Sequence, residues 1–225
     1  MNTPLSIKPE KLPVTVDAVF RRLFDDEGPD ALSLHLVNAL LDLNPPLTNV
    51  RQLRTQRDGE QAQHRGAILD LVLTDEDGRL VNVEMQVIFH DFLPERALFY
   101  WSRLYSNQLK AGEDYIDLRP VISLLILRFK LLPEQTDWHH TYTLTHHATG
   151  HALSSHFALH IVELPKLADR SIDALKTPAE KWLYFILNAR RASSEELARL
   201  GEPFLRAEAR LKTISEEDIL QGRPR

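Results

Sequence analysis

Two segments with alternating side chains flank the turn sequence Asp75-Glu76-Asp77-Gly78. The odd positions are apolar from 69 to 73 and again from 81 to 87, whereas the even positions include Asp70, Asn82, Glu84 and Gln86. Side chains alternate between faces along a strand, and Asp-Gly between two such runs is a strong hairpin signal. The pattern predicts a β-hairpin over residues 66–88 that turns its odd face into the core.

The same pattern constrains the register of this hairpin. Both odd faces are buried together only when the numbers of paired residues add up to an even value. One such sum gives a register with a three-residue turn, in which Gly78 takes a left-handed conformation. In this register Asp70 pairs with Glu84. Their Cβ atoms are then expected to lie roughly 4.5–5.5 Å apart, with Gln86 one pleat further along the same face.

Two carboxylates at that separation repel each other, and a divalent cation between them removes the conflict. Oxygen ligands with several waters favour Mg²⁺ or Mn²⁺ over Zn²⁺. Such an ion lowers the pKa of a bound water, which Gln86 could orient. A solvated hairpin face is the competing interpretation, and spacing alone leaves both open. The apolar run around Asp70 favours a site, because an unpaired carboxylate there costs several kcal/mol.

The segments that follow predict an α/β fold. A helix over 93–110 precedes a continuously apolar strand over 121–129, and this strand–helix–strand order implies parallel pairing. Residues 138–164 predict a second hairpin that turns near Thr149-Gly150, residues 178–190 a helix, and residues 194–213 one or two more helices. We expect an arm over 1–14, one domain over 15–213 and a flexible tail over 214–225.

Composition excludes several classes of protein. The chain has no cysteine, so disulfides, thiolate metal sites and cysteine nucleophiles are excluded. A net charge of -5 argues against nucleic-acid binding by bulk electrostatics alone, but not against a metal-dependent nuclease. The N-terminus does not look like a signal peptide, and no run approaches the roughly 20 apolar residues of a membrane span. We therefore expect a cytoplasmic protein without a membrane partner.

Several motifs, in this order, resemble the recombination-promoting nuclease and transposase family of the PD-(D/E)XK superfamily. The resemblance covers about residues 15 to 210. The motifs are Asp17-Ala-Val-Phe-Arg-Arg-Leu-Phe, Ile68-Leu69-Asp70, Val83-Glu84-Met85-Gln86, Arg96-Ala-Leu-Phe-Tyr-Trp-Ser-Arg-Leu-Tyr105 with Gly112 and Tyr115, and Glu180-Lys-Trp-Leu-Tyr-Phe185.

The resemblance implies a restriction-endonuclease-like core: a central mixed sheet flanked by helices, with a C-terminal helical segment. It implies metal-dependent cleavage of DNA phosphodiesters in recombination, mobile elements or phage defence. By position, Asp70 and Glu84 become metal ligands, Asp17 completes the acidic set, and Gln86 replaces the usual lysine. Glutamine cannot stabilise developing charge as an ion, so this departure bears on the catalytic rate.

Two further groups of residues have competing interpretations. Arg96 and Arg103 lie seven positions apart on the helix over 93–110, where they could bind DNA phosphates, or Arg103 could belong to a solvated stripe. Seven histidines between positions 139 and 160 match no standard zinc spacing, and we expect them on the exposed face of the second hairpin.

Sequence favours a Mg²⁺-dependent endonuclease with Asp70, Glu84 and Gln86 as catalytic residues. One alternative is a nuclease-fold module without useful activity that binds DNA or protein, and another is a structural subunit of a transposition machine. Cleavage of both strands usually needs two sites, so a homodimer is a further expectation, although no interface is identified.

Overall fold

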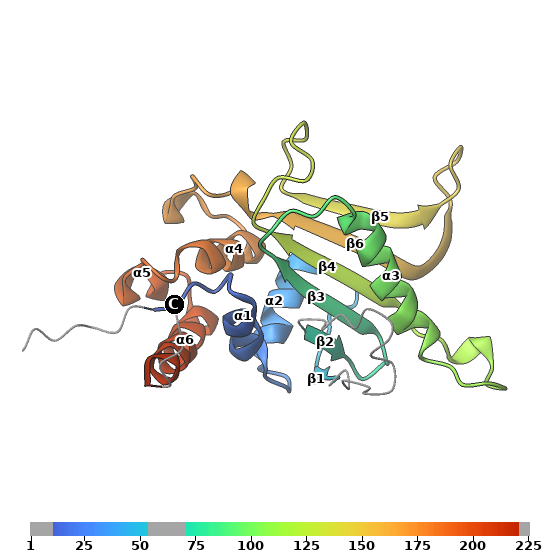
Figure 1. Ribbon diagram of the computed structural model, residues 1–225, viewed down its shortest axis with the longest axis horizontal. Helices are drawn as coiled ribbons and strands as arrows, with labels where there is room; N and C mark the ends of the chain where they lie inside the picture. The colour runs from blue at the N-terminus through green and yellow to red at the C-terminus, as the bar shows by residue number, and fades with distance from the viewer. Residues whose placement is uncertain (1–10, 54–70, 221–225) are drawn as a thin grey trace, which may run out of the picture.

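The computed structural model describes residues 11–53 and 71–220 of the chain. In this part, six strands form one mixed sheet in the order β1-β2-β3-β4-β6-β5. The strands are β1 (Arg51–Gln52), β2 (Leu71–Thr74), β3 (Leu80–Gln86), β4 (Val121–Leu127), β5 (His139–Thr145) and β6 (Ala152–Glu163). β4 runs parallel to β3 and β6, and the other neighbours are antiparallel. The predicted α/β fold with a mixed sheet is confirmed (Figure 1).

The first hairpin has the predicted register along its described length. Leu71 pairs with Val83 and Leu73 with Val81, so the sequence numbers of each pair add up to the predicted sum. The peptide N–H of Gly78 donates to the Asp75 carbonyl, and Gly78 has a positive φ of 79°, which glycine adopts without steric cost. The odd strand residues Leu71, Leu73, Val81, Val83 and Met85 lie in the core, but Val87, predicted inside, follows the end of β3 and is exposed.

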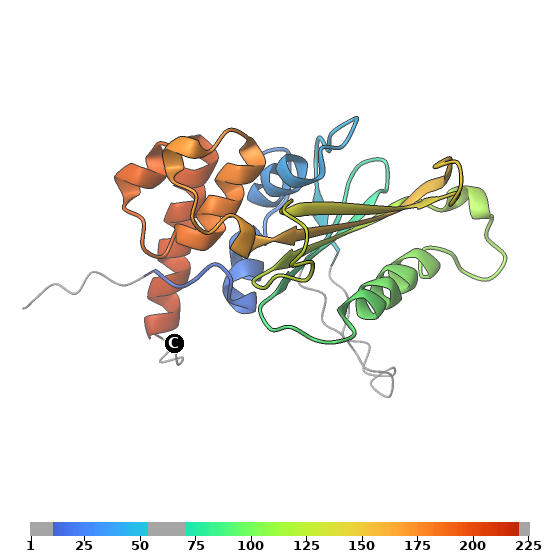
Figure 2. The same cartoon turned by 90° about the horizontal axis from the view of Figure 1, so that it is seen from above.

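The two faces of the sheet are covered unequally. The main core lies on the odd face of β2 and β3, where α1 (Asp17–Phe24), α2 (Leu32–Leu41), α4 (Pro178–Asn188), α5 (Ser194–Ala198) and α6 (Glu202–Leu220) pack. A smaller core lies on the opposite face, where Leu93 and Ala97 of α3 (Leu93–Ser106) pack against apolar side chains of β4 and β6. Figure 2 shows α3 below the sheet and the other helices beside and above it. Glu84 therefore lies on the α3 face.

The C-terminal helices have clear local causes. Thr177 and Glu180 form a capping box at the start of α4, and Pro178 occupies the first turn, where its missing N–H is no loss. α6 continues past residue 213, the expected end of the domain, because Ile214 and Ser215 are buried against the rest of the fold. The Ser215 hydroxyl accepts a hydrogen bond from the Leu12 peptide, which ties the N-terminal segment to this helix.

Three short 3-10 helices complete the described elements: η1 (Tyr115–Asp117), η2 (Leu164–Lys166) and η3 (Ile172–Ala174). The edge strand β1 pairs antiparallel with β2. Among the described residues, no helix has both the length and the apolar character that crossing a membrane requires.

Candidate active site

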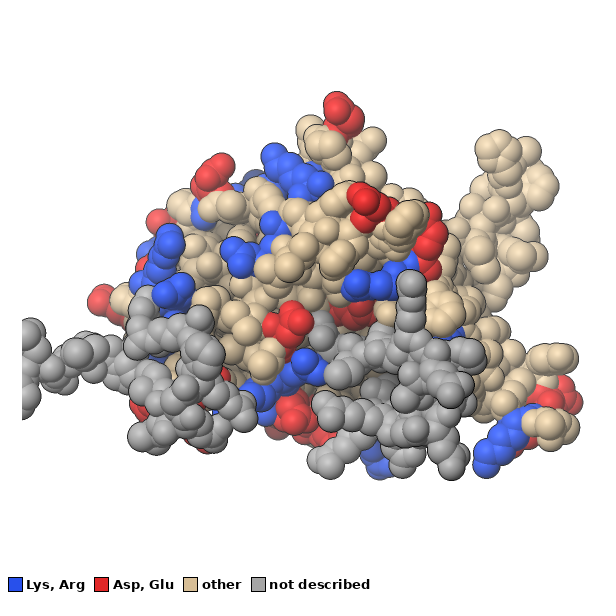
Figure 3. All heavy atoms as spheres, viewed as in Figure 1, with Lys and Arg blue, Asp and Glu red and all other residues tan. Residues whose placement is uncertain are grey.

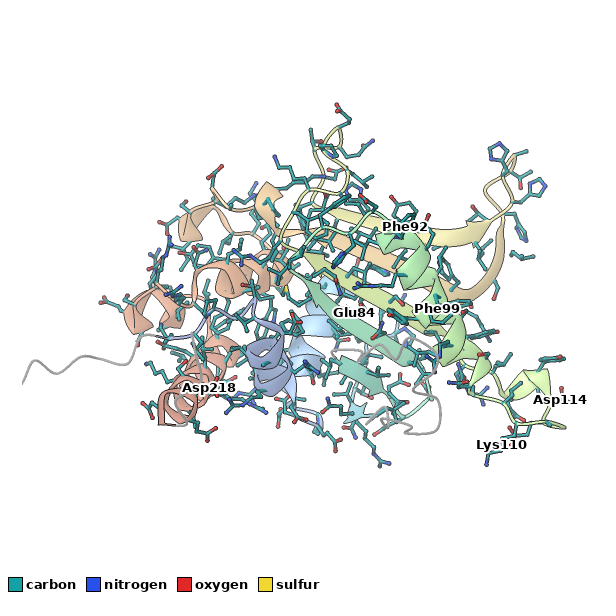
Figure 4. All side chains as sticks on the ribbon, viewed as in Figure 1. Glu84, Phe92, Phe99, Lys110, Asp114 and Asp218 are labelled. Atoms are coloured by element: carbon teal, nitrogen blue, oxygen red, sulfur yellow. The ribbon has the colours of Figure 1, made fainter. Side chains whose placement is uncertain are left out.

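The even face of β3 carries three polar side chains: Asn82, Glu84 and Gln86. Glu84 is 4% exposed and Asn82 1%, while Gln86 at the end of the strand is half-buried. Figure 4 shows Glu84 on β3 beside α3, which carries the labelled and exposed Phe99 and is preceded by the exposed Phe92. The interpretation of Glu84 as part of a solvated face is therefore wrong.

The Glu84 carboxylate accepts a hydrogen bond on each oxygen. The Asn82 side-chain amide donates to Oε1 at 2.8 Å, and the Gln86 amide donates to Oε2 at 3.1 Å. Gln86 is itself oriented by Arg96 of α3, whose Nη2 donates to the Gln86 side-chain oxygen at 2.6 Å. The same Nη2 lies 3.8 Å from Glu84 Oε2, within ion-pair range. Together they form a continuous polar network between β3 and α3.

Burial dominates the electrostatics of this carboxyl group. Loss of water raises the pKa of Glu84 above its ordinary value, because the charged form is disfavoured in a medium of low polarity. The Asn82 hydrogen bond, the Arg96 charge and the Gln86 hydrogen bond act in the opposite direction without cancelling this effect. A buried carboxylate with a raised pKa, held by dedicated donors, is typical of a functional site.

Two polar atoms beside Glu84 were missed by the sequence reasoning. Asn82 Oδ1 and Ser123 Oγ are buried, and neither has a hydrogen-bond partner among the described residues. Asn82 and Ser123 are directly paired on the parallel strands β3 and β4. Both oxygens can accept from a water or face a hard cation. The signals were present: Asn82 shares the period of Glu84, and Ser123 is the one polar residue within β4.

The structure does not bring together the full predicted acidic set. Asp70 lies outside the described residues, so its predicted pairing with Glu84 stays a prediction. Asp17 is exposed in the first turn of α1, a helix whose apolar side belongs to the main core on the other face of the sheet. Within residues 11–53 and 71–220, no three His, Asp or Glu side chains form a group that could hold a metal ion.

The two arginines predicted to bind DNA have different surroundings. Arg96 turns toward β3 and also lies 6.0 Å from the centre of the Tyr100 ring. Arg103 is half-buried and lies 5.9 Å from the centre of the Phe99 ring. Their binding to phosphate stays a prediction. Figure 3 shows acidic and basic side chains interspersed on the described part of this face, in keeping with the modest net charge of -5.

The expectation of an exposed histidine face is wrong for part of the second hairpin. His160 is 6% exposed, and its Nδ1 lies 2.9 Å from Nε2 of the half-buried His139. His140 contacts the buried carboxylate of Glu163, and His156 contacts the Tyr105 hydroxyl. Pairing with β6 places these side chains against neighbours, whereas His146, His147 and His151 near the turn are exposed as expected.

Comparison with protein families identifies the family to which the chain belongs. A model of PD-(D/E)XK nuclease family transposases matches residues 14–221 of the chain. The chain belongs to this family. Searches of curated proteins and of solved structures returned no match. The match spans the whole described fold, including the strand that carries Glu84.

Membership in the PD-(D/E)XK nuclease family transposases confirms the resemblance found in the sequence. The family name describes nucleases, which hydrolyse phosphodiester bonds, and nucleases of this type generally use divalent metals. In this chain the strand reads Glu84-Met85-Gln86, and its correspondence to the (D/E)XK pattern, with glutamine in the lysine position, stays a prediction.

Proposed function

We propose that this PD-(D/E)XK family chain is an Mg²⁺-dependent DNA endonuclease that acts on mobile elements, in recombination or in phage defence within the cytoplasm. The observation that carries the proposal is the Glu84 carboxylate, buried on the α3 face and held by Asn82 and Gln86. Arg96 lies at ion-pair distance, 3.8 Å from the carboxylate, but its hydrogen bond goes to Gln86, and burial still raises the pKa of Glu84.

The residues present fit a hard divalent cation. Glu84 and the Asn82 oxygen, which lacks a partner in the described part of the chain, offer the oxygen donors that Mg²⁺ and Mn²⁺ prefer. We propose that Glu84 and Asp70 hold the ion, since the observed register, continued by one residue, pairs Asp70 with Glu84. When bound, such an ion lowers the pKa of a water and polarises a phosphoryl oxygen.

Side chains of the protein hold the reacting groups in position. Gln86 donates to Glu84 and accepts from Arg96, so its amide plane is fixed and its position beside the carboxylate suits it to steer water. Attack by the water oxygen forms a bond to phosphorus, the bond from phosphorus to the leaving sugar oxygen breaks, and the leaving oxygen takes up a proton. Arg96 and Arg103 on α3 provide positive charge for the DNA backbone.

The test is Mg²⁺-dependent nicking of a supercoiled plasmid by the purified chain. Asp70→Ala and Glu84→Ala are expected to lose activity by at least about 100-fold, because each removes charge that acts on the transition state. Glu216→Ala, which removes an exposed carboxylate on α6, is the control and should cleave normally. Equal nicking by all four preparations would assign the activity to a contaminant and reject the proposal.

Gln86 favours a second candidate function. A neutral side chain in the lysine position fits a nuclease fold kept as a DNA-binding or protein-binding module. The two candidates differ in metal binding, which calorimetric titration with Mn²⁺ measures. Binding that is lost in Glu84→Ala supports the enzyme, whereas a wild type that binds no Mn²⁺ and still binds DNA supports the module. Size measurement in solution then tests the proposed homodimer.

A further inference from the structure

Arg96 reaches the candidate site from a different element. Residue 96 lies in the first half of α3, and its side chain crosses to the end of β3, where it contacts Gln86 at 2.6 Å. The Arg96 side chain as a whole remains one-third exposed, so a ligand can reach part of it. Arginine stays charged at all relevant pH values, so this contact brings a permanent positive charge to the strand motif.

We propose that Arg96 supplies the catalytic cation that the lysine of the (D/E)XK pattern would otherwise provide. The inference rests on the proposed nuclease function and assigns Arg96 a role beyond binding the DNA backbone. Gln86 occupies the lysine position without charge, and the nearest guanidinium nitrogen is bonded to its side-chain oxygen. Gln86 therefore connects the Glu84 carboxylate to the Arg96 cation. The positive charge that the (D/E)XK pattern places on the lysine is here carried by Arg96, the neighbour to which Gln86 is hydrogen-bonded.

Among the described residues, Arg96 uses only some of its hydrogen-bond donors. The guanidinium has five N–H bonds, and its described hydrogen bond, through Nη2, goes to Gln86. Its Nε is buried and has no partner among the described residues. A guanidinium anchored at one nitrogen retains donors for the oxygens of a phosphate, which gain negative charge during hydrolysis. A purely structural arginine would be expected to direct its donors to protein acceptors.

Arg103 provides an internal comparison. It lies on the same helix and packs on Phe99, and no described hydrogen bond or ion pair connects it to β3. If positive charge on α3 served only to attract DNA, the two arginines would be equivalent. The contacts of Arg96 with Gln86 and Glu84 distinguish them, so Arg103→Met is the matched control for Arg96→Met.

Moving the positive charge from residue 96 to residue 86 tests the inference in a cleavage assay. Arg96→Met is expected to lower kcat by about 100-fold with little change in KM, as expected when a donor to the transition state is removed. The double variant Arg96→Met with Gln86→Lys should recover at least about tenfold in kcat, and Arg96→Lys should recover part of the loss. Arg103→Met, which removes only a charge for the DNA backbone, should raise KM and leave kcat near that of the wild type. The inference is overturned if Arg96→Met raises KM without lowering kcat. It is also overturned if the double variant is folded and its kcat is no higher than that of Arg96→Met.

Metal binding provides a readout that does not depend on cleavage. Because Arg96 lies beside Glu84, removing its charge should make Mn²⁺ bind more tightly in calorimetry, by about tenfold at the strength of nearby charges in a protein. Adding Gln86→Lys to Arg96→Met should reverse this gain in Mn²⁺ affinity. Arg103→Met should bind Mn²⁺ with the affinity of the wild type. Unaltered Mn²⁺ affinity in Arg96→Met overturns the role of Arg96, whereas a wild type without Glu84-dependent cleavage instead rejects the nuclease proposal.

Discussion

Glu84 illustrates at the scale of one residue how this fold gives up stability at its site. The carboxylate is buried, two neutral amides donate to it, and the nearest cation is bonded elsewhere. Burial of this charge opposes folding even with Arg96 at ion-pair distance, as the raised pKa of Glu84 indicates, so a residue kept there serves a purpose other than stability. Stability and activity are therefore expected to change in opposite directions when Glu84 is neutralised.

Glu84→Gln is expected to abolish cleavage and raise the free energy of unfolding by about 1 kcal/mol at pH 7 without divalent metal. Burial raises the pKa of Glu84 in the folded state, so folded protein loses stability from this group as pH rises through that pKa. Glutamine keeps the shape and removes the charge. Urea denaturation in EDTA measures the difference, and a less stable variant would show that the ionised carboxylate stabilises the fold.

His160 gives the second prediction at this scale, a loss of stability in mild acid. Burial, and then the charge of His139, lower the pKa of His160 from 6.5 to about 4. Between these values the unfolded chain binds more protons, so the free energy of unfolding should fall as pH drops from about 6.5 toward 5. Above pH 7 this group has no effect. His160→Gln, which cannot be protonated, should flatten the dependence of the urea midpoint on pH.

The pH range of this experiment needs to end near 5. Hydrogen bonds and ion pairs lower the pKa values of Glu163, Glu180 and Glu208, and their contribution to stability is present above about pH 4.5 and is lost below it. Measurements at pH 7.5, 6.5, 5.8 and 5.2 therefore avoid these three carboxylates, and the comparison with His160→Gln separates His160 from Glu84 and His139, whose pKa values are also shifted. An identical slope for wild type and His160→Gln in that range would contradict the prediction.

Among the elements, the first hairpin was predictable because local rules determine it. Period-two alternation identified the buried face, and the Asp-Gly turn fixed the register that β2 and β3 adopt from Leu71 to Thr74. The parallel pairing of β3 with β4 followed from the helix between them. Each of these inferences depends on residues close in sequence, where backbone geometry alone limits the alternatives.

Gly78→Ala tests the turn that sets this register. Gly78 has a φ of 79°, and an added Cβ would lie 3.1 Å from Cγ of Arg119. The left-handed conformation alone costs about 1–2 kcal/mol for alanine. Gly112→Ala is the matched control, since Gly112 has a φ of 93° but open space around the added Cβ. We expect Gly78→Ala to lower the free energy of unfolding more, and equal losses would mean that Arg119 simply moves aside.

The parts of the site that sequence did not predict depend on tertiary contacts. No periodicity indicates that Arg96 of α3 reaches the end of β3, because this depends on how the helix lies across the sheet. Likewise His160 is buried because β6 pairs with β5 and His139 packs against it, although its neighbours in sequence gave no such signal. The partnerless Ser123 oxygen became visible only once β4 was placed beside Asn82.

At the scale of the whole molecule, the sheet separates stability from chemistry. The main core joins five helices to the odd face of β2 and β3, whereas Glu84 and Gln86 lie on the face that α3 partly covers (Figure 2). α6 stabilises the helical side of the fold, because Lys11 forms an ion pair with Glu208 and Arg22 forms one with Asp218. The helix that ends the described chain thereby holds its N-terminal segment in place.

This separation predicts that damage to the helical core leaves the site intact. Leu211 of α6 is fully buried, so Leu211→Ala should lower the free energy of unfolding by about 2–5 kcal/mol through lost burial and a residual cavity. The folded fraction should still bind Mn²⁺ with wild-type affinity, because β3 and α3 keep their contacts. Calorimetry below the unfolding transition, corrected for the folded fraction, makes the comparison. A large change in affinity would mean that the helical layer positions Glu84 through the sheet, and the two faces would then act as one unit.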